Sequence, residues 1–413
     1  MSEAHGKTAA EGGLGGGEAA PRAGAVSAAA LVYGVIFFSF LDLFSQLPIM
    51  STFAQSLGAS LTLIGVIVGM YSFANIGGNL LAGVMADRWG AFGVLVAGLL
   101  GTTILLASYS VVETPYALLA VRFFHGLIGG FIVPAAFTYI ANENNRKESG
   151  RMSASTGALI GSAAIVGPAF GGIMAANTSP GAVFMTVGVF GAVLCLGVLV
   201  FLRRRGVSEF RKRTPSLASA RNRSVFFAVL GAFLLMFSQG ALAYLLPLRV
   251  AEFGLSSSAS GMLLSVFGVV AVLFFILPTK RIYDRIPPVR GLQAGMLLLG
   301  LSQLALSAAG GQNWLYAIMV MYGIGFAFIY PSMNILLIRG TEPGNRGKAY
   351  GILYAFFSIG VVAGSSGLGT LPLDISGMFA ATGALLLAGF LSCFLHREPP
   401  PAPARESGIP SRQ

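Results

Sequence analysis

The sequence predicts an all-α polytopic membrane protein with twelve transmembrane helices in two pseudo-symmetric halves of six helices each. Its composition, its distribution of basic residues and an internal repeat support this prediction. Of the 413 residues, 55% are hydrophobic and only 10% are charged, too few polar side chains to cover a water-soluble domain of this size. The apolar runs are about twenty residues long, enough to cross a bilayer core of about 30 Å as a helix. Strands of outer-membrane barrels alternate apolar and polar residues, a pattern that these runs lack.

The apolar runs divide the chain into spans and connections. We expect a disordered tail at 1–25, an N-terminal six-helix half at 26–202, a basic linker at 203–224, a C-terminal six-helix half at 225–396 and a second tail at 397–413. The first tail lacks the apolar core of a cleaved signal peptide, so the first span is expected to remain in the protein. The predicted spans are 27–50, 61–86, 92–112, 116–141, 152–176, 181–202, 225–251, 259–279, 291–309, 314–338, 349–370 and 376–396.

Basic residues lie on one side of this arrangement. The chain has 26 Lys and Arg, and all except Arg122 and Arg249 fall in the tails or in alternate connections between the spans. The positive-inside rule then places both termini and the 203–224 linker in the cytoplasm, in a cell (inner or plasma) membrane. The net charge of +11 therefore reflects topology and contact with membrane lipids, and no nucleic-acid partner is expected.

An internal repeat relates the two halves. One shift of 197 residues superposes equivalent positions from the second span to the eleventh without an insertion. Internal duplication of a helical bundle is typical of secondary transporters, whose substrate site lies near the bilayer midplane between the repeats. The superposed positions include Asp87 and Asp284, Arg88 and Arg285, Gly98 and Gly295, Gly126 and Gly323, Pro134 and Pro331, and Gly167 and Gly364.

The connection between the second and third spans carries a motif of the form G-x-x-x-D-R-x-G. With this motif the chain resembles the major facilitator superfamily over its whole length. The resemblance implies the major facilitator fold, usually a monomer, in which this loop is a conformational latch. Ala91 and Phe92 stand where the family usually has basic residues. The latch residues implied here are Gly83, Asp87, Arg88 and Gly90, with Asp284 and Arg285 in the repeat.

The fifth span carries a second motif, Gly167-Pro168-Ala-Phe-Gly171-Gly172. Proline kinks a helix, and the glycines admit a neighbouring backbone at close range. The motif is similar to the G-P-x-x-G-G signature of the drug:proton antiporter branch of the superfamily. Ala154 and Ala163 stand where that pattern has further glycines. The resemblance favours export over import, although helix packing alone would also require these residues.

Three ionisable side chains lie deep within the spans. Asp42 lies in the first span, and Arg122 and His125 share one face of the fourth. Counting from the outer ends of the helices, they lie roughly 12, 9 and 13 Å deep, that is, at one level. Intramembrane charges are costly and mark functional sites, so we predict that Asp42, Arg122 and His125 couple transport to protons. The alternative is a purely structural ion pair between Asp42 and Arg122.

Neutral polar and aromatic residues are the candidates for substrate binding. Arg122 opens a sequence similar to the R-x-x-x-G motif of the fourth span that the superfamily ties to proton coupling. The resemblance also implies that spans 1, 4, 7 and 10 line a central cavity. Gln239 and Tyr322 are the repeat counterparts of Asp42 and His125. The full set of candidates is Ser39, Gln46, Gln239, Tyr244, Tyr322, Tyr330 and Asn334.

The expected function is proton-coupled export of a small organic molecule, drug-like or metabolic, by alternating access. The sequence has no Walker motif, no H-E-x-x-H and no cysteine pair at metal spacing, so we expect no enzyme activity, cofactor or metal. The alternatives are an importer or facilitator of the same fold, and a receptor that does not transport. A carboxylate among aromatic rings suits a cationic drug, whereas Arg122, His125 and Arg249 suit an anionic metal chelator such as a siderophore. The sequence does not choose between these substrates.

Overall fold

The protein is described here from a computed structural model, which describes residues 23–143, 149–202, 222–276, 286–341 and 346–395. None of these residues lies in a strand. Most of both expected tails, the 203–221 part of the linker, and Asp284 and Arg285 lie outside the described residues.

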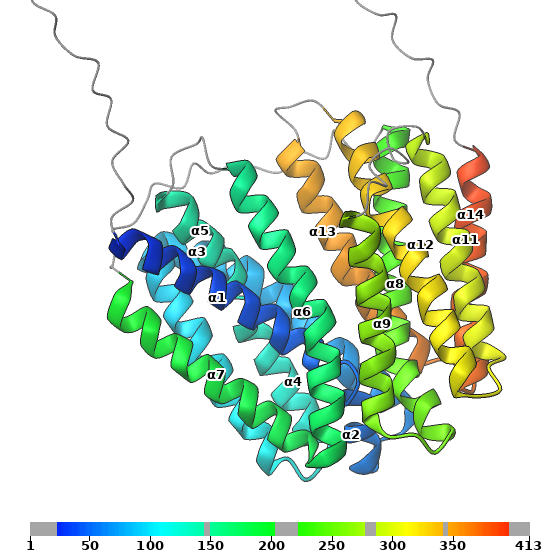
Figure 1. The fold of residues 1–413 in the computed structure, drawn as a ribbon, viewed down its shortest axis with the longest axis horizontal. Helices are drawn as coiled ribbons and strands as arrows, with labels where there is room; N and C mark the ends of the chain where they lie inside the picture. The colour runs from blue at the N-terminus through cyan, green and yellow to red at the C-terminus, as the bar shows by residue number, and fades with distance from the viewer. Residues whose placement is uncertain (1–22, 144–148, 203–221, 277–285, 342–345, 396–413) are drawn as a thin grey trace, which may run out of the picture.

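Two groups of helices stand side by side (Figure 1). The first group contains α1 (Ala23–Gln46), α2 (Met50–Ser56), α3 (Leu61–Ser108), the 3₁₀ turn η1 (Tyr109–Val111), α4 (Pro115–Gly129), α5 (Ile132–Glu143), α6 (Ser149–Asn177) and α7 (Pro180–Phe201). The second group contains α8 (Arg223–Glu252), α9 (Ser257–Ile276), α11 (Pro288–Ser307), α12 (Gln312–Arg339), α13 (Arg346–Val362), the π-turn η4 (Ala363–Gly367), α14 (Ile375–Ser392) and the 3₁₀ turn η5 (Cys393–Leu395).

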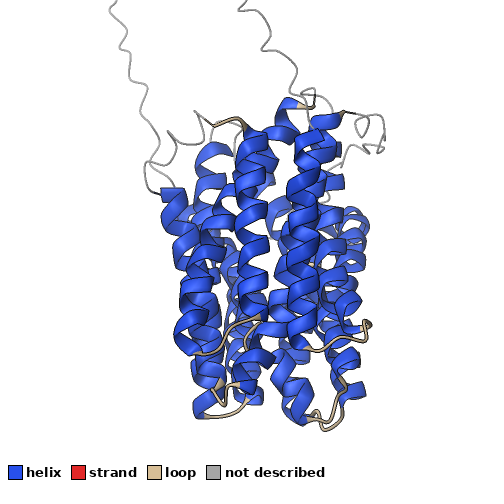
Figure 2. Cartoon of the chain, turned by 90° about the vertical axis from the view of Figure 1, so that its right-hand side faces the viewer, coloured by secondary structure: helices blue, strands red, loops and turns tan. Residues whose placement is uncertain are grey.

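The helices run roughly parallel to one another, with most described loops at the two ends of the bundle (Figure 2). Within the described residues, ten helical segments are long and apolar enough to cross a membrane by themselves. The bent pair α1 and α2 makes an eleventh span. The shorter apolar segment Ile352–Gly367, which joins α13 to η4, stands where the remaining predicted span was expected. The all-helical fold is therefore confirmed, and these segments are consistent with twelve spans.

The first span is broken near its end. α1 stops at Gln46, and the chain bends by 49° before α2 begins at Met50. Pro48 lies in this break, where its ring prevents the helix from continuing and disfavours a helical conformation at Leu47. The first span therefore continues past the predicted end at residue 50 as the bent pair Ala30–Gln46 and Met50–Ser56.

The second and third spans form one kinked helix, α3. Its only non-helical residue is Gly90, with φ 76° and ψ 155°. An L-residue with a side chain rarely adopts this φ, so the last glycine of the latch motif is the one that makes the turn. The loop expected at 87–91 is thus reduced to a kink at a single residue.

The repeat also places backbone irregularities at equivalent points. Pro168 interrupts α6, and its counterpart after the 197-residue shift, Ser365, lies in the π-turn η4 at the end of α13. Both positions are in the fifth span of their half. A proline and a π-turn each leave backbone groups out of the regular helical ladder. The two halves therefore carry a departure from the regular helix at equivalent positions, a proline in α6 and a π-turn after α13.

The two halves meet near the turns at 57–60 and 253–256, an end of the bundle that we call the distal end. The hydroxyl of Tyr244 in α8 donates to the carbonyl of Leu61 at 2.7 Å, and Ser51 in α2 donates to the carbonyl of Tyr244 at 2.8 Å. Ser366 in η4 donates to the carbonyl of Gly65 in α3 at 3.2 Å. Each of these bonds joins a neutral hydroxyl to a backbone carbonyl.

Many large apolar side chains remain on the outside of the bundle. Such an apolar surface is unfavourable in water and suits contact with lipid chains. On α7 the exposed side chains are Met185, Val189, Val193, Leu196, Leu199, Val200 and Phe201.

Candidate functional site

The polar face of α1 is buried inside the first half. Asp42 is 2% exposed and Gln46, one helical turn later, is 3% exposed. The Nε2 atom of Gln46 donates to Oδ1 of Asp42 at 2.6 Å. Among the described residues Asp42 is the only buried carboxylate. An ionised carboxylate in such surroundings needs hydrogen-bond donors or a positive partner.

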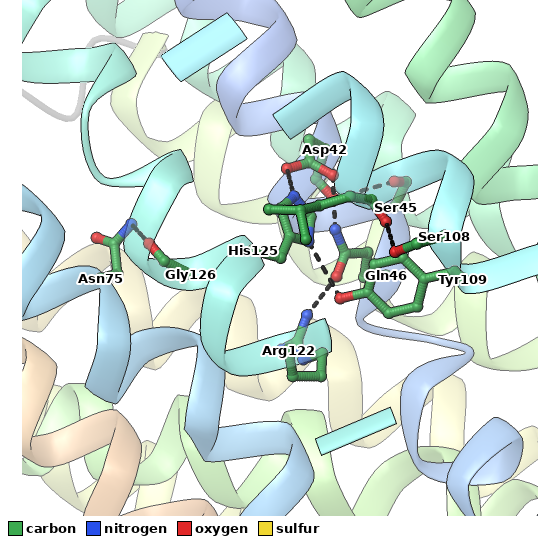
Figure 3. A network of polar contacts seen from close by, with 10 residues as sticks. Asp42, Ser45, Gln46, Asn75, Ser108, Tyr109, Arg122, His125 and Gly126 are labelled. Atoms are coloured by element: carbon green, nitrogen blue, oxygen red, sulfur yellow. Dashed lines mark hydrogen bonds and ion pairs between the residues drawn. The ribbon is translucent and has the colours of Figure 1, made fainter. Parts of the chain in front are cut away.

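His125 of α4 supplies the second partner of this carboxylate. Its Nε2 atom lies 3.1 Å from Oδ2 of Asp42. On the other side of the ring, Nδ1 lies 3.1 Å from the hydroxyl oxygen of Tyr109 in η1. The imidazole is fully buried and stands edge-on to the rings of Tyr71 and Tyr109. Both ring nitrogens therefore have polar neighbours, as Figure 3 shows.

Arg122 joins the same group through Gln46. Its Nη1 atom donates to Oε1 of Gln46 in a very short hydrogen bond. Its Nε and Nη2 atoms donate to the backbone carbonyls of Ile67 and Val68 in α3, at 3.3 and 3.2 Å. The guanidinium carbon also lies 4.9 Å from the centre of the Tyr71 ring. We call Asp42, Gln46, Tyr109, Arg122 and His125 the Asp42 cluster.

The three ionisable residues predicted to share one depth thus lie together, but their connections differ from the simplest expectation. The ionisable partner of Asp42 is His125, and the amide of Gln46 bridges Asp42 to Arg122. The Gln46 amide must turn its NH₂ to the carboxylate and its oxygen to the guanidinium, because the first accepts only and the second donates only. Gln46, which we expect in substrate binding, is a buried member of the cluster.

A glycine brings α4 close enough to α3 for these contacts. A Cβ atom on Gly126 would lie 2.2 Å from the carbonyl oxygen of Tyr71, so only glycine fits there. The side chain of Asn75 in α3 donates to the carbonyl of Gly126 at 3.1 Å. Gly126 therefore sets the distance between α4, which carries Arg122, and α3, whose carbonyls Arg122 binds.

The glycines of the fifth-span motif pack α6 against α1 beside Asp42. A Cβ on Gly167 would lie 2.7 Å from Cβ of Phe44, and one on Gly171 would lie 1.9 Å from the carbonyl oxygen of Ser45. Ser45 in turn donates its hydroxyl to the carbonyl of Asp42 at 3.1 Å. The motif thus holds α6 against the turn of α1 that follows the carboxylate.

The same motif also contacts the second half. A Cβ on Gly172 would lie 2.8 Å from Cα of Gly261 in α9, and one on Gly261 would lie 2.3 Å from the carbonyl oxygen of Pro168. The hydroxyl of Ser257 donates to the carbonyl of Gly172 at 3.2 Å. One turn of α6 therefore touches both the helix of Asp42 and the opposite half.

The second half holds a neutral cluster at the equivalent place. The hydroxyls of Tyr322 in α12 and Ser238 in α8 lie 2.9 Å apart, and Gln303 in α11 donates to Ser238 at 2.9 Å. Tyr322 is the repeat counterpart of His125 and is fully buried. This cluster joins the first, third and fourth spans of its half, as the Asp42 cluster does, but contains no ionisable carboxylate or imidazole.

Arg249 connects three helices of the second half near the distal end. Its Nη1 atom lies 2.9 Å from Oε2 of Glu252, and its Nη2 atom donates to the carbonyl of Ser307 at 3.1 Å and to Ser376 at 2.5 Å. The guanidinium carbon lies 5.9 Å from the centre of the Phe379 ring. These contacts tie α8 to α11 and α14.

The other predicted substrate residues are spread over different surroundings. Tyr244 is buried and bonded at the distal contact. Ser39 and Gln239 are half-buried, and the structure brings neither into the Asp42 cluster. Tyr330 is 36% exposed, and Asn334 donates to its carbonyl at 2.8 Å. The backbone of the latch residues Gly83, Asp87 and Arg88 is helical within α3.

Two aromatic members of the site were missed from the sequence. Tyr71 and Tyr109 both touch the imidazole of His125, yet each stands in a run of ordinary apolar residues. Spacing gave no signal for them, because their proximity depends on how α3 packs on α4. Within the described part of the chain, no group of three His, Cys, Asp or Glu side chains could hold a metal ion.

Comparison with known proteins places this architecture in a family. The family model described as Major Facilitator Superfamily matches residues 32–248 and again 228–412, one match for each half. The chain belongs to the Major Facilitator Superfamily. It is therefore related to membrane transporters, and the resemblance that the two sequence motifs indicated is confirmed.

The superfamily member resembles known efflux proteins in sequence. It is 27% identical over 335 residues to the tetracycline resistance protein, class C, of Escherichia coli, covering 78% of this chain and 81% of that one. It is 24% identical over 332 residues to the multi-drug resistance efflux pump PmrA of Streptococcus pneumoniae, covering 77% and 82%.

Solved structures agree with the fold. A bacterial homologue of the human lysosomal transporter Spinster, in an inward-facing and unoccupied conformation, aligns with a TM-score of 0.75 at 14% identity. The alignment covers 91% of this chain and 97% of that structure. At this identity the likeness supports the fold alone.

Proposed function

We propose that this superfamily member is a proton-coupled antiporter that exports a small organic molecule across the inner or plasma membrane, with both termini in the cytoplasm. The observation that carries the proposal is the buried carboxylate of Asp42, held between the imidazole of His125 at 3.1 Å and the amide of Gln46 at 2.6 Å. A carboxylate can bind and release one proton, and within a membrane such a group is a functional candidate.

The cycle uses the two connections of Asp42. When the cavity opens outward, Asp42 binds a proton and loses its charge. The amide bridge through Gln46 then holds Arg122 less firmly, which favours rocking toward the inward-open state. There the proton leaves and substrate binds. Because proton and substrate are bound in alternation, each exported molecule is exchanged for inward proton movement.

Packing supplies a way for this change to reach the other half. Gly171 rests on the carbonyl of Ser45, and Gly172 on the backbone of Gly261 in α9. A shift of α1 after protonation of Asp42 must therefore displace α6, and with it the contact between the halves. Arg122 offers a second route, because it binds the carbonyls of Ile67 and Val68 between two glycines of the distal contact, Gly65 and Gly69.

Two observations support export. The relatives include a tetracycline resistance protein and a multidrug efflux pump. The hydrogen bonds of Ser51, Tyr244 and Ser366 join the halves at the distal end. With both termini in the cytoplasm the distal end is extracellular, and these bonds close the outer end of the interface between the halves, as an exporter that takes substrate from the cytoplasm requires.

Occupancy of the buried cations favours a neutral or cationic substrate. Arg122 donates to Gln46 and to two backbone carbonyls. Arg249 is bound by Glu252, Ser307 and Ser376, which leaves only its Nε atom without a hydrogen-bond partner. An anionic chelator would have to displace these partners, whereas the half-buried amides of Gln239 and Asn334 and the ring of Tyr330 can contact a neutral or cationic molecule.

The test is proton movement triggered by substrate in liposomes that hold purified protein and an internal pH dye. Cationic drugs, neutral drugs and anionic chelators are added one at a time. We expect a neutral or cationic compound to move protons in wild type and not in Asp42→Asn. Asp374→Asn is the matched control, because Asp374 is the exposed N-cap of α14 and Asn caps helices equally well.

The outcomes separate the rival functions. If substrate moves without protons, and equally in wild type and in Asp42→Asn, the protein is a facilitator or importer and not an antiporter. If no compound causes proton or substrate movement although the protein is folded, a receptor with the same fold that does not transport would be favoured. A response confined to anionic chelators would overturn the proposed substrate class alone.

A further inference from the structure

The proposed cycle leaves one polar member of the Asp42 cluster without a role. The hydroxyl of Tyr109 lies 3.1 Å from Nδ1 of His125. The Tyr109 ring is 1% exposed and stacks on Phe184 of α7, with ring centres 4.0 Å apart. This stacking holds the hydroxyl at the imidazole, and a phenolic hydroxyl can either donate or accept a hydrogen bond.

Few charged or titratable groups face the imidazole in the described structure. Asp42 approaches from α1, Tyr71 from α3 and Tyr109 from η1, while Arg122 lies on α4 itself. Arg122 is directed at Gln46 and at backbone carbonyls. Tyr71 presents its ring edge-on rather than a hydrogen bond. Asp42 and Tyr109 are therefore the polar groups that contact the two ring nitrogens of His125.

The hydrogen positions follow from what each group can do. An ionised Asp42 only accepts, so Nε2 of a neutral His125 must carry the hydrogen that points to Oδ2. Nδ1 is then the acceptor, and Tyr109 donates to it. The Tyr109 contact has hydrogen-bond geometry, whereas the approach of Nε2 to Oδ2 is a charge contact at 3.1 Å without a hydrogen bond.

A first proton can enter this arrangement while the contact between His125 and Tyr109 is kept, at the cost of the hydrogen bond that the Tyr109 hydroxyl donates. It binds the lone pair of Nδ1, and the imidazole becomes a cation that donates from both nitrogens. The Tyr109 hydroxyl rotates, and its oxygen accepts the new Nδ1 hydrogen. Asp42, Gln46 and Arg122 keep the hydrogen bonds that the structure gives them.

A second proton cannot enter so easily, because it has to bind Asp42. On Oδ2 it would meet the Nε2 hydrogen of His125, and on Oδ1 the amide hydrogen of Gln46. If the Gln46 amide turned over, its oxygen could accept a hydrogen bond from a proton on Oδ1. Its NH₂ group would then face the donors of Arg122. The proton can instead take a free lone pair of either oxygen, but in each case Asp42 loses its charge and with it the attraction to the protonated imidazole that joins α1 to α4.

We propose that Tyr109 is a reversible donor and acceptor that keeps its contact with His125 when the Asp42 and His125 pair binds a first proton, so that the second proton, on Asp42, removes the charge attraction between α1 and α4. The proposal rests on the proposed function, in which Asp42 exchanges protons during transport. Tyr109 acts through His125 and is a positioning residue. The proton that is exchanged for substrate in each cycle is then the second proton bound by the pair.

The first experiment counts protons taken up by purified full-length protein in weakly buffered detergent solution as the pH is lowered. Asp42→Asn/His125→Gln provides the reference. We expect wild type to bind two more protons per molecule than this variant, in two separate steps. A difference of one proton would overturn the proposal, and no difference would overturn the proposed function itself.

The role of Tyr109 is tested by Tyr109→Phe, which keeps the ring and removes the oxygen. The cation on His125 loses an acceptor, and hydrogen bonds to charged groups are stronger than those to neutral ones. We therefore expect the first uptake step to move to lower pH by about half to one unit. In a His125→Gln background the same substitution should move nothing. An unchanged first uptake step, or an equal shift in both backgrounds, would overturn the proposal, because Tyr109 would then serve only in packing.

A measurement on wild type avoids dependence on a folded variant. The chain has three histidines, so ¹⁵N-histidine labelling gives few ring signals, and His125→Gln assigns those of His125. At high pH we expect Nδ1 to be unprotonated and Nε2 to carry the hydrogen. The opposite tautomer would mean that Tyr109 already accepts, and would contradict the proposal.

Discussion

The Nε2 atom of His125 lies 3.1 Å from Oδ2 of Asp42, and both side chains are buried, at 0% and 3% exposure. This contact joins α1 to α4 within one half of the transporter. Its partners, Gln46 and Tyr109, are both neutral groups that can donate or accept. When the charge of either member of the pair changes, Gln46 and Tyr109 therefore have to change their hydrogen bonds.

The first prediction concerns the amide bridge. Gln46→Leu keeps the size of the side chain but removes its bonds to Asp42 and Arg122. We expect the free energy of unfolding to fall by about 1–3 kcal/mol, because two buried polar groups lose a partner. Thermal unfolding in detergent measures this, and transport in liposomes should also fall. Gln55→Leu, at an exposed site of α2, is the matched control. Equal stability of the two variants would contradict the bridge.

The second prediction concerns the fifth-span motif. A methyl group on Gly171 would lie 1.9 Å from the carbonyl oxygen of Ser45, so Gly171→Ala forces α6 away from α1. We expect a loss of about 1–3 kcal/mol in stability and at least a tenfold loss of transport. Gly310→Ala is the control, since nothing lies within 4 Å of a Cβ there. Wild-type transport by Gly171→Ala would show that this close approach is dispensable.

The third prediction separates the two buried arginines. Arg249→Gln should lower the melting temperature, because it breaks the ties from α8 to Ser307 and Ser376, at a cost of about 1–3 kcal/mol. It should leave the number of protons bound unchanged, because Arg249 has no contact with the Asp42 cluster. Proton counting and thermal unfolding on the same preparation test both statements. A lost proton in Arg249→Gln would place this arginine in the coupling machinery.

The fourth prediction concerns topology. A cysteine introduced by Gly310→Cys lies in the turn between α11 and α12 at the distal end. We expect it to react in intact cells with a maleimide that cannot cross the membrane. Cys195 and Cys393 are buried, so the wild-type background should be low. Labelling that requires broken cells would reverse the proposed orientation.

Much of the fold could be predicted from the sequence because membrane spans are set by local composition. The apolar runs located every described helix except α2 to within a few residues, and the 197-residue shift pairs Pro168 with Ser365, which lies in the π-turn. The errors arose where single residues control the backbone. Pro48 ends α1 early, and Gly90 turns the chain inside α3 with no loop.

The site could be predicted only in part. Helix rise was enough to put Asp42, Arg122 and His125 at one level, since depth depends on position along each helix. Contacts between side chains depend on helix rotation and rotamers, which spacing does not give. Hence the link from Gln46 to Asp42 and Arg122 was not predicted, and Tyr109 was overlooked although it touches His125.

The central claim is that protonation of Asp42 drives transport. The most direct measurement is uphill substrate movement in liposomes under an imposed pH gradient, with substrate initially equal on both sides. Wild type should concentrate substrate on the acidic side, and Asp42→Asn should carry substrate only down its own gradient. Gradient-driven accumulation by Asp42→Asn at the wild-type level would contradict the account.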